Sequence, residues 1–140
     1  YYTIRTVGVG AWTGTLLMEW SGMMIGLDGT DDITIKLPEM TVNNGTGWNC
    51  SFVITHVVAS GKDIVIKTNG ASADNSDDIT LIQVNTAASL TSTEDGDTIT
   101  MAQGATVGTY LELVCILDGS AEKWIAKCYN SDGSTVSCAN

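Results

Sequence analysis

The sequence is poor in positive charge and in the residues from which most catalytic sites are built. It has six Lys and Arg residues against 16 Asp and Glu, a formal net charge of −10, and one histidine, His56. A surface this acidic repels phosphate backbones and anionic lipid. We therefore expect no nucleic-acid partner.

Long hydrophobic runs are also missing. A membrane-spanning helix needs roughly 18 to 20 apolar residues, and the closest segment, 16–27, is interrupted by Glu19 and two glycines. We expect no membrane span. With 140 residues and 44% hydrophobic content, the chain is long and apolar enough to fold as one domain. It begins at Tyr1 rather than Met, which indicates that a preceding segment has been removed.

No segment has the apolar spacing of a capped helix, and the hydrophobic period is two almost throughout. The stretch "WNCSFVITHVV" places Trp48, Cys50, Phe52, Ile54 and His56 on one face, and "TYLELVCIL" alternates in the same way. Turn signals such as Ser60-Gly61 and Asp95-Gly96 separate these runs. The pattern predicts an all-β fold, a single antiparallel β-sandwich of jelly-roll type over residues 28–140, with an N-terminal strand arm.

Residues 1–27 differ from the rest and are predicted to be an arm and an apolar assembly segment. The arm "YYTIRTVGV" would form an edge strand, and an apolar edge with little charge is an aggregation hazard unless another subunit covers it. The alternative is that the segment simply lies inside the sandwich. The candidate contact residues are Tyr1, Tyr2, Ile4, Val7, Val9, Trp12, Leu16, Leu17, Trp20, Met23 and Met24.

Acidic residues cluster in turns that precede strands. Asp and Asn suit turns because they accept backbone hydrogen bonds, so solvated turns explain each cluster singly. Calcium, with six to eight oxygen ligands, is the alternative because it would relieve the repulsion between neighbouring carboxylates. The candidate calcium ligands are Asp28, Asp31, Asp32, Asp74, Asp77 and Asp78.

The four cysteines include no C-x-x-C pair, which disfavours a zinc site. Cys128 and Cys138 lie symmetrically about Gly133, so a hairpin centred there would bring them within disulfide distance. Cys50 and Cys115 would then form the second disulfide. The alternatives are a Cys115–Cys128 disulfide or four reduced core thiols.

Nothing in the sequence indicates an enzyme. His56 lies in the middle of an expected strand, where a packed or polar-paired side chain is the better interpretation. The carboxylates are local to single turns, whereas a glycosidase needs two that face each other across a cleft. Trp48 and Trp124 alternate with core positions and are predicted to be buried.

Three sequence motifs occur in a characteristic order: "ITIKLPEMT", then "FVITHVVASGKDIVIKTNG", then "EDGDTITMAQGATVGTYLELVCILDGSAEKWIAKCY". From Asp31 onward the chain resembles small β-domains of tailed-phage virion proteins, found in capsid decoration proteins and in head or tail fibres. The N-terminal arm and the four cysteines are not part of this pattern.

The resemblance implies a non-enzymatic virion structural protein on the particle surface. Such a protein would contact copies of itself, as a trimer in the typical case, and a major capsid protein. One alternative is an extracellular, pilus-like filament subunit that polymerises by exchange of its N-terminal strand. Another is a calcium-dependent carbohydrate-binding module that uses exposed tryptophans.

Overall fold

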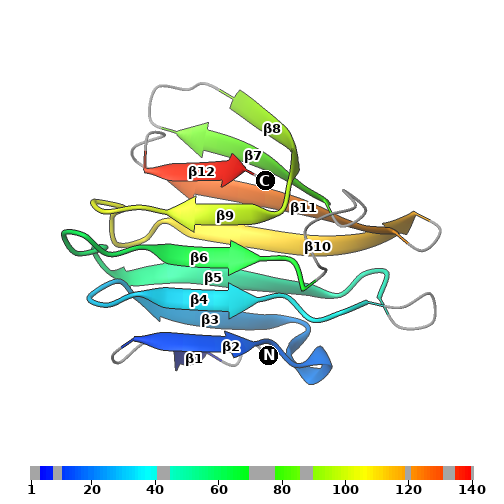
Figure 1. Ribbon diagram of the computed structural model, residues 1–140, viewed down its shortest axis with the longest axis horizontal. Coiled ribbons are helices and arrows are strands. Elements are labelled where there is room, and N and C mark those ends of the chain that lie inside the picture. Colours follow the sequence, from blue (N-terminus) through cyan, green and yellow to red (C-terminus); the bar gives the residue numbers. More distant parts are fainter. Residues whose placement is uncertain are drawn as a thin grey trace.

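The structure is a computed structural model that describes residues 4–7, 11–40, 45–69, 78–85, 90–118, 121–130 and 135–139 (Figure 1). The described residues form twelve strands and one 3-10 helix. These elements are β1 (Ile4–Val7), β2 (Trp12–Thr15), η1 (Met18–Trp20), β3 (Met23–Asp28), β4 (Ile33–Lys36), β5 (Asn49–His56), β6 (Ile64–Lys67), β7 (Asp78–Asn85), β8 (Leu90–Gly96), β9 (Thr98–Met101), β10 (Tyr110–Asp118), β11 (Ala121–Asn130) and β12 (Val136–Ala139). The prediction of an all-β chain is confirmed.

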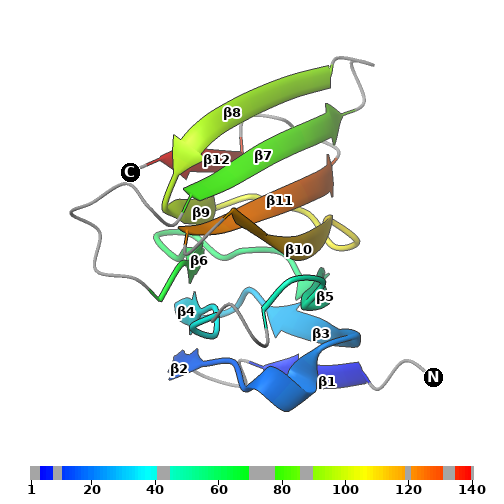
Figure 2. The same cartoon turned by 90° about the vertical axis from the view of Figure 1, so that its right-hand side faces the viewer.

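The strands form two sheets that lie as two layers (Figures 1 and 2). Sheet A has seven strands in the order β1-β3-β5-β10-β11-β7-β8, and sheet B has five in the order β12-β9-β6-β4-β2. The first six strands alternate between the sheets, so the chain winds through three successive coils. In each sheet, strands of successive coils lie side by side and parallel.

The predicted antiparallel, jelly-roll-like arrangement is not confirmed, because both sheets are mixed. The described parallel pairs are β1–β3, β3–β5, β2–β4, β4–β6 and β7–β11. The pairs β5–β10, β10–β11, β7–β8, β6–β9 and β9–β12 are antiparallel. Each turn in the coiled part carries the chain to the other sheet instead of closing a hairpin.

One apolar core lies between the sheets. Sheet A contributes residues such as Phe52 and Trp124, and sheet B contributes isoleucines from β4, β6 and β9, all fully buried. Trp48 is also buried, and its ring meets Trp124 edge-on with centroids 5.7 Å apart. The predicted burial of both tryptophans is confirmed.

The predicted boundary after residue 27 falls inside β3. Ile25 and Leu27 in this strand are completely buried in the common core, and β3 pairs with both β1 and β5. The N-terminal segment therefore shares its sheets and its core with the rest of the chain.

The predicted inner face of β5 holds as far as Ile54 and ends before His56. The register with β3 shifts at this point, because Leu27 pairs with Ile54 whereas Asp28 pairs with His56. The extra residue in β5 turns the His56 side chain outward, where it is 62% exposed and lies 3.4 Å from an Asp28 carboxylate oxygen. The expectation that His56 is polar-paired is confirmed.

Candidate assembly surfaces

The N-terminal coil leaves one strand edge open in each sheet. β1 is the last strand of sheet A and β2 the last strand of sheet B, and both lie at the same end of the molecule (Figures 1 and 2). In β2, the Trp12 N–H donates to Asp32 O at 3.0 Å and the Leu16 N–H to Lys36 O at 2.9 Å. Because N–H groups alternate along a strand, those of Thr13 and Thr15 point away from β4.

Apolar side chains next to this edge are only partly covered. Trp12, Met18, Trp20 and Met23 are partly buried and pack against the core. The Trp12 indole lies so close to Gly14 that a Cβ there would meet ring carbons at 2.6–2.7 Å, so any larger residue at position 14 would displace it. The open end of the core is thus lined by large side chains that keep some exposed surface.

The predicted assembly residues differ in burial and in position. Leu16 is buried at 1% exposure, whereas Leu17 is 50% exposed. Met24 is half-buried and pairs in register with Ser51 on the outer face of sheet A. Ile4 and Val7 lie in β1, and Tyr1, Tyr2 and Val9 lie outside the described residues.

The turn after β3 uses its carboxylates within the chain. Asp28 accepts hydrogen bonds from the N–H and hydroxyl of Thr30 at 3.0 and 2.8 Å, which hold its pKa below the usual value. The ammonium of Lys62 lies 3.0 Å from Asp31 and 3.1 Å from Asp32. Hydrogen bonding to Lys62 lowers the pKa of Asp31, and a backbone hydrogen bond from Asp63 is the main cause of the lowered pKa of Asp32.

The second predicted calcium cluster is only partly described. Asp74 and Asp77 lie outside the described residues, and Asp78 is buried and forms an ion pair with Lys123. Within the residues that the structure places, no group of three or more His, Cys, Asp or Glu side chains could hold a metal ion. The described candidate ligands Asp28, Asp31, Asp32 and Asp78 each have a hydrogen-bond or ion-pair partner within the chain.

The predicted disulfides are not formed. All four cysteines lie in described strands and are thiols. Cys128 is in sheet A, whereas Cys138 is in β12, which pairs with β9 of sheet B rather than with β11. Cys50 is opposite Leu113, two residues from Cys115 in the register of β5 and β10. β11 and β12 therefore do not form the hairpin that the predicted Cys128–Cys138 disulfide required.

We expect iodoacetamide to alkylate four cysteines after unfolding without reductant, seen as four added groups in the intact mass. In the folded chain Cys138 should react first, because it is half-buried whereas the other three are buried. Reaction should still be slow near neutral pH, because burial raises the pKa of Cys138 to about 11 and that of Cys128 to about 12. An unfolded chain that accepts fewer groups would show that disulfides form.

The outer face of sheet A carries several exposed apolar side chains, which the sequence pattern did not lead us to predict as a surface. Outward-facing side chains of β10 and β11 include an aromatic pair, Tyr110 and Tyr129, with ring centroids 6.3 Å apart. Ile116 and Tyr129 are 47% and 46% exposed, and Val84 on β7 is 39% exposed. The signal was present in "TYLELVCIL", where the face opposite Leu111 and Leu113 is also largely apolar.

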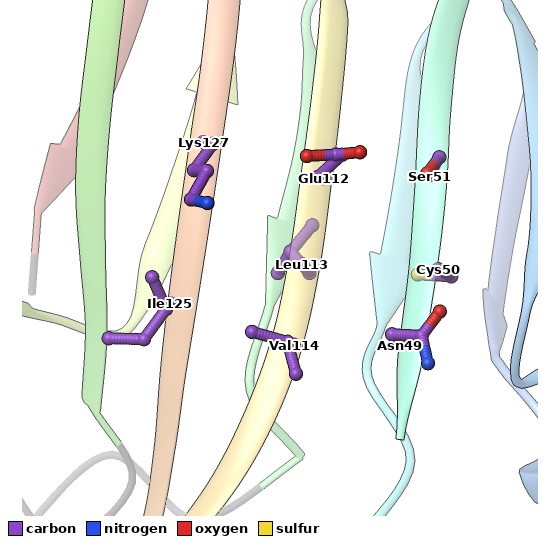
Figure 3. A pocket seen from close by; sticks show the side chains of 8 residues that line it. All are labelled: Asn49, Cys50, Ser51, Glu112, Leu113, Val114, Ile125 and Lys127. Carbon is purple, nitrogen blue, oxygen red and sulfur yellow. The ribbon is translucent and has the colours of Figure 1, made fainter. Parts of the chain in front are cut away.

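A shallow hollow of about 260 Å³ lies on this face, across β5, β10 and β11 (Figure 3). Its lining residues are Asn49, Cys50, Ser51, Glu112, Leu113, Val114, Ile125 and Lys127. Beside it, the Tyr110 hydroxyl lies 2.9 Å from Ser51 Oγ and 3.2 Å from a Glu112 carboxylate oxygen. In Figure 3, Lys127, Glu112 and Ser51 form a polar row across the hollow, and Ile125, Val114 and Asn49 form a second, mainly apolar row.

Within the described residues, no helix has the length and apolarity that crossing a bilayer requires. Comparisons of the chain with protein-family models, curated proteins and solved structures found no match.

Proposed function

We propose that this chain is a non-enzymatic structural subunit of a virion, part of a fibre or of the capsid decoration, held by contacts between its copies. The observation that carries the proposal is that, among the described residues, each sheet ends on both sides in a strand that pairs with only one neighbour in that sheet. β1 and β2 form one end, and β8 and β12 lie at the other edges of their sheets. Head-to-tail contacts between such ends generate a fibre.

The edge strands have few of the features that normally prevent such pairing. β2 ("WTGT") and β12 ("VSCA") contain no charged residue and no proline. Equal lengths suit stacking of β12 on β2, although the Val136 carbonyl of β12 already accepts a hydrogen bond from the Gln83 side chain at 3.0 Å.

The same edges support a second candidate, an extracellular filament subunit outside any virion. Both candidates use the N-terminal end, and they differ in whether the chain is part of a virion. Mass spectrometry and cryo-microscopy of purified particles would find the chain on virions in the first case. Absence from particles would leave the filament.

We expect Thr13→Pro to disrupt end-to-end assembly without unfolding the chain. The Thr13 N–H points away from β4, so proline removes no hydrogen bond within sheet B, yet it blocks a strand added at this edge. One lost hydrogen bond together with the steric block should weaken assembly about tenfold or more. Size-exclusion chromatography with light scattering and negative-stain microscopy measure the effect.

Thr13→Ala is the matched control, because it removes the same side chain but keeps the N–H donor. It should assemble like the unmodified chain, and circular dichroism should show that both variants are folded. Fibres that persist unchanged in Thr13→Pro would rule out assembly at the β2 edge.

A further inference from the structure

The two outer faces of the molecule differ in chemistry. The outer face of sheet B carries mainly threonine and lysine, with Thr13 and Thr15 on β2, Thr34 and Lys36 on β4, and Lys67 on β6. The outer face of sheet A carries valine, isoleucine and tyrosine, including three of the six large apolar side chains that are exposed in the described residues. Exposed apolar side chains that gather on one face of a folded chain indicate an interaction surface.

The outer face of sheet A is also locally neutral on a strongly acidic molecule. Across β10, β11 and β7, its described charged side chains are Glu112, Lys123 and Lys127, together with Asp78, which is ion-paired with Lys123. These two acids and two bases cancel, whereas the whole chain carries a formal charge of −10. Depletion of charge is typical of the centre of a protein interface, and a neutral face lets two acidic copies approach with little repulsion.

The register of β10 and β11 makes this face complementary to itself. Glu112 lies opposite Lys127, Tyr110 opposite Tyr129, and Val114 opposite Ile125. A two-fold axis that runs along the strands midway between β10 and β11 exchanges the members of each pair between two copies. It therefore sets Glu112 of one copy against Lys127 of the other, with the tyrosine row on one side and the Val114–Ile125 row on the other.

The same axis would cover the hollow with the second copy. The axis also brings β5 of one copy over β7 of the other, because these strands flank the central pair. Ile82 is in register with Lys127, as Ser51 is with Glu112. Ile82 of the second copy, which is half-buried, would thus lie opposite Ser51 at the edge of the hollow.

We propose that a second copy of this chain docks on the outer face of sheet A, about a two-fold axis along the strands between β10 and β11. This contact goes beyond the end-to-end contact of the proposed function and uses none of the edge strands. It pairs subunits laterally, so each contact can be tested without the other.

The test is an exchange of charges, measured by native mass spectrometry. Glu112→Lys places the introduced lysine of one copy against Lys127 of the other, and Lys127→Glu places the introduced glutamate against Glu112. Each single variant should dimerise at least about tenfold more weakly than the unmodified chain. When the two variants are mixed, with one isotope-labelled, every contact across the axis again joins opposite charges, so a heterodimer should form.

The mixture distinguishes contacts between chains from contacts within a chain. In each variant, positions 112 and 127 of the same chain carry like charges whether or not the variants are mixed. Mixing can therefore restore only the contacts between chains. Lys36→Glu and Lys67→Glu change charge on the outer face of sheet B and should leave dimerisation unchanged. Thr13→Pro should form the dimer normally, which distinguishes failure of the end-to-end contact from failure of this one. An unmodified chain that stays monomeric, or variants that fail to associate when mixed, would overturn the proposal and leave the face to a different ligand.

Discussion

Replacing Trp124 with alanine is expected to lower the free energy of unfolding by about 3–5 kcal/mol. The Trp124 side chain is fully buried, its ring meets Trp48 edge-on, and its indole N–H donates to a Glu122 carboxylate oxygen at 3.2 Å. Removing the ring leaves a cavity between the sheets that the rigid strands around it can fill only in part. Urea unfolding followed by circular dichroism measures the loss.

Val107→Ala is the control for this substitution. Val107 is 59% exposed in a turn, so truncating it should change the unfolding free energy by no more than about 0.5 kcal/mol. If Trp124→Ala cost no more than Val107→Ala, the packing of the two sheets around Trp124 would be wrong.

Replacing Glu122 with leucine is expected to lower the free energy of unfolding by about 2–4 kcal/mol, although it exchanges a buried polar group for an apolar one. Glu122 is 3% exposed, and one carboxylate oxygen accepts the Met40 N–H at 2.5 Å while the other accepts the Trp124 indole N–H. Leucine leaves both donors buried without that acceptor, at about 1–3 kcal/mol each, and burying an apolar side chain in place of the carboxyl group offsets part of this cost. The carboxylate thus connects β11 to the segment that follows β4.

Glu122→Gln tests the role of the two oxygens. Its single amide oxygen can accept from one of the two donors, so we expect its unfolding free energy to lie between those of Glu122→Leu and the unmodified chain. Urea midpoints of the three proteins give the order directly. A leucine variant as stable as the unmodified chain would show that the two hydrogen bonds contribute nothing net.

Strands and core residues were predictable because burial on a pleated strand has a period of two. Leu111, Leu113 and Cys115 are buried as predicted, and so are Phe52 and Ile54. Each of these residues has more exposed neighbours on both sides in the strand. This alternation can be read from the sequence because apolar and polar residues alternate with the same period. The burial of Trp48 and Trp124 was predictable for the same reason.

Strand direction and partner were not predictable, because parallel and antiparallel strands share that period. The symmetric spacing of Cys128 and Cys138 suggested a hairpin, but β12 crosses to sheet B and pairs with β9. The turn between β8 and β9 shows that a turn signal in the sequence does not determine which strands the turn connects. A Cβ at Gly96 would lie 2.4 Å from Cys138 Sγ, so Asp95-Gly96 marks a close approach between the sheets rather than a two-residue hairpin turn.

The candidate surfaces were predictable only in part. An apolar, nearly uncharged N-terminal segment indicated an unsatisfied edge, and β1 and β2 do form the last strands of their sheets. The outer face of sheet A depends on the register of Tyr110, Glu112 and Val114 with β11, which only the fold provides. Pairing across strands, rather than composition, makes that face complementary to itself.

The mass of the unmodified chain in dilute solution tests the central claim, that this molecule is built to contact copies of itself. Sedimentation velocity over a series of concentrations should give a mass above that of the 14.7 kDa chain and rising with concentration. A constant 14.7 kDa at every concentration would contradict the claim.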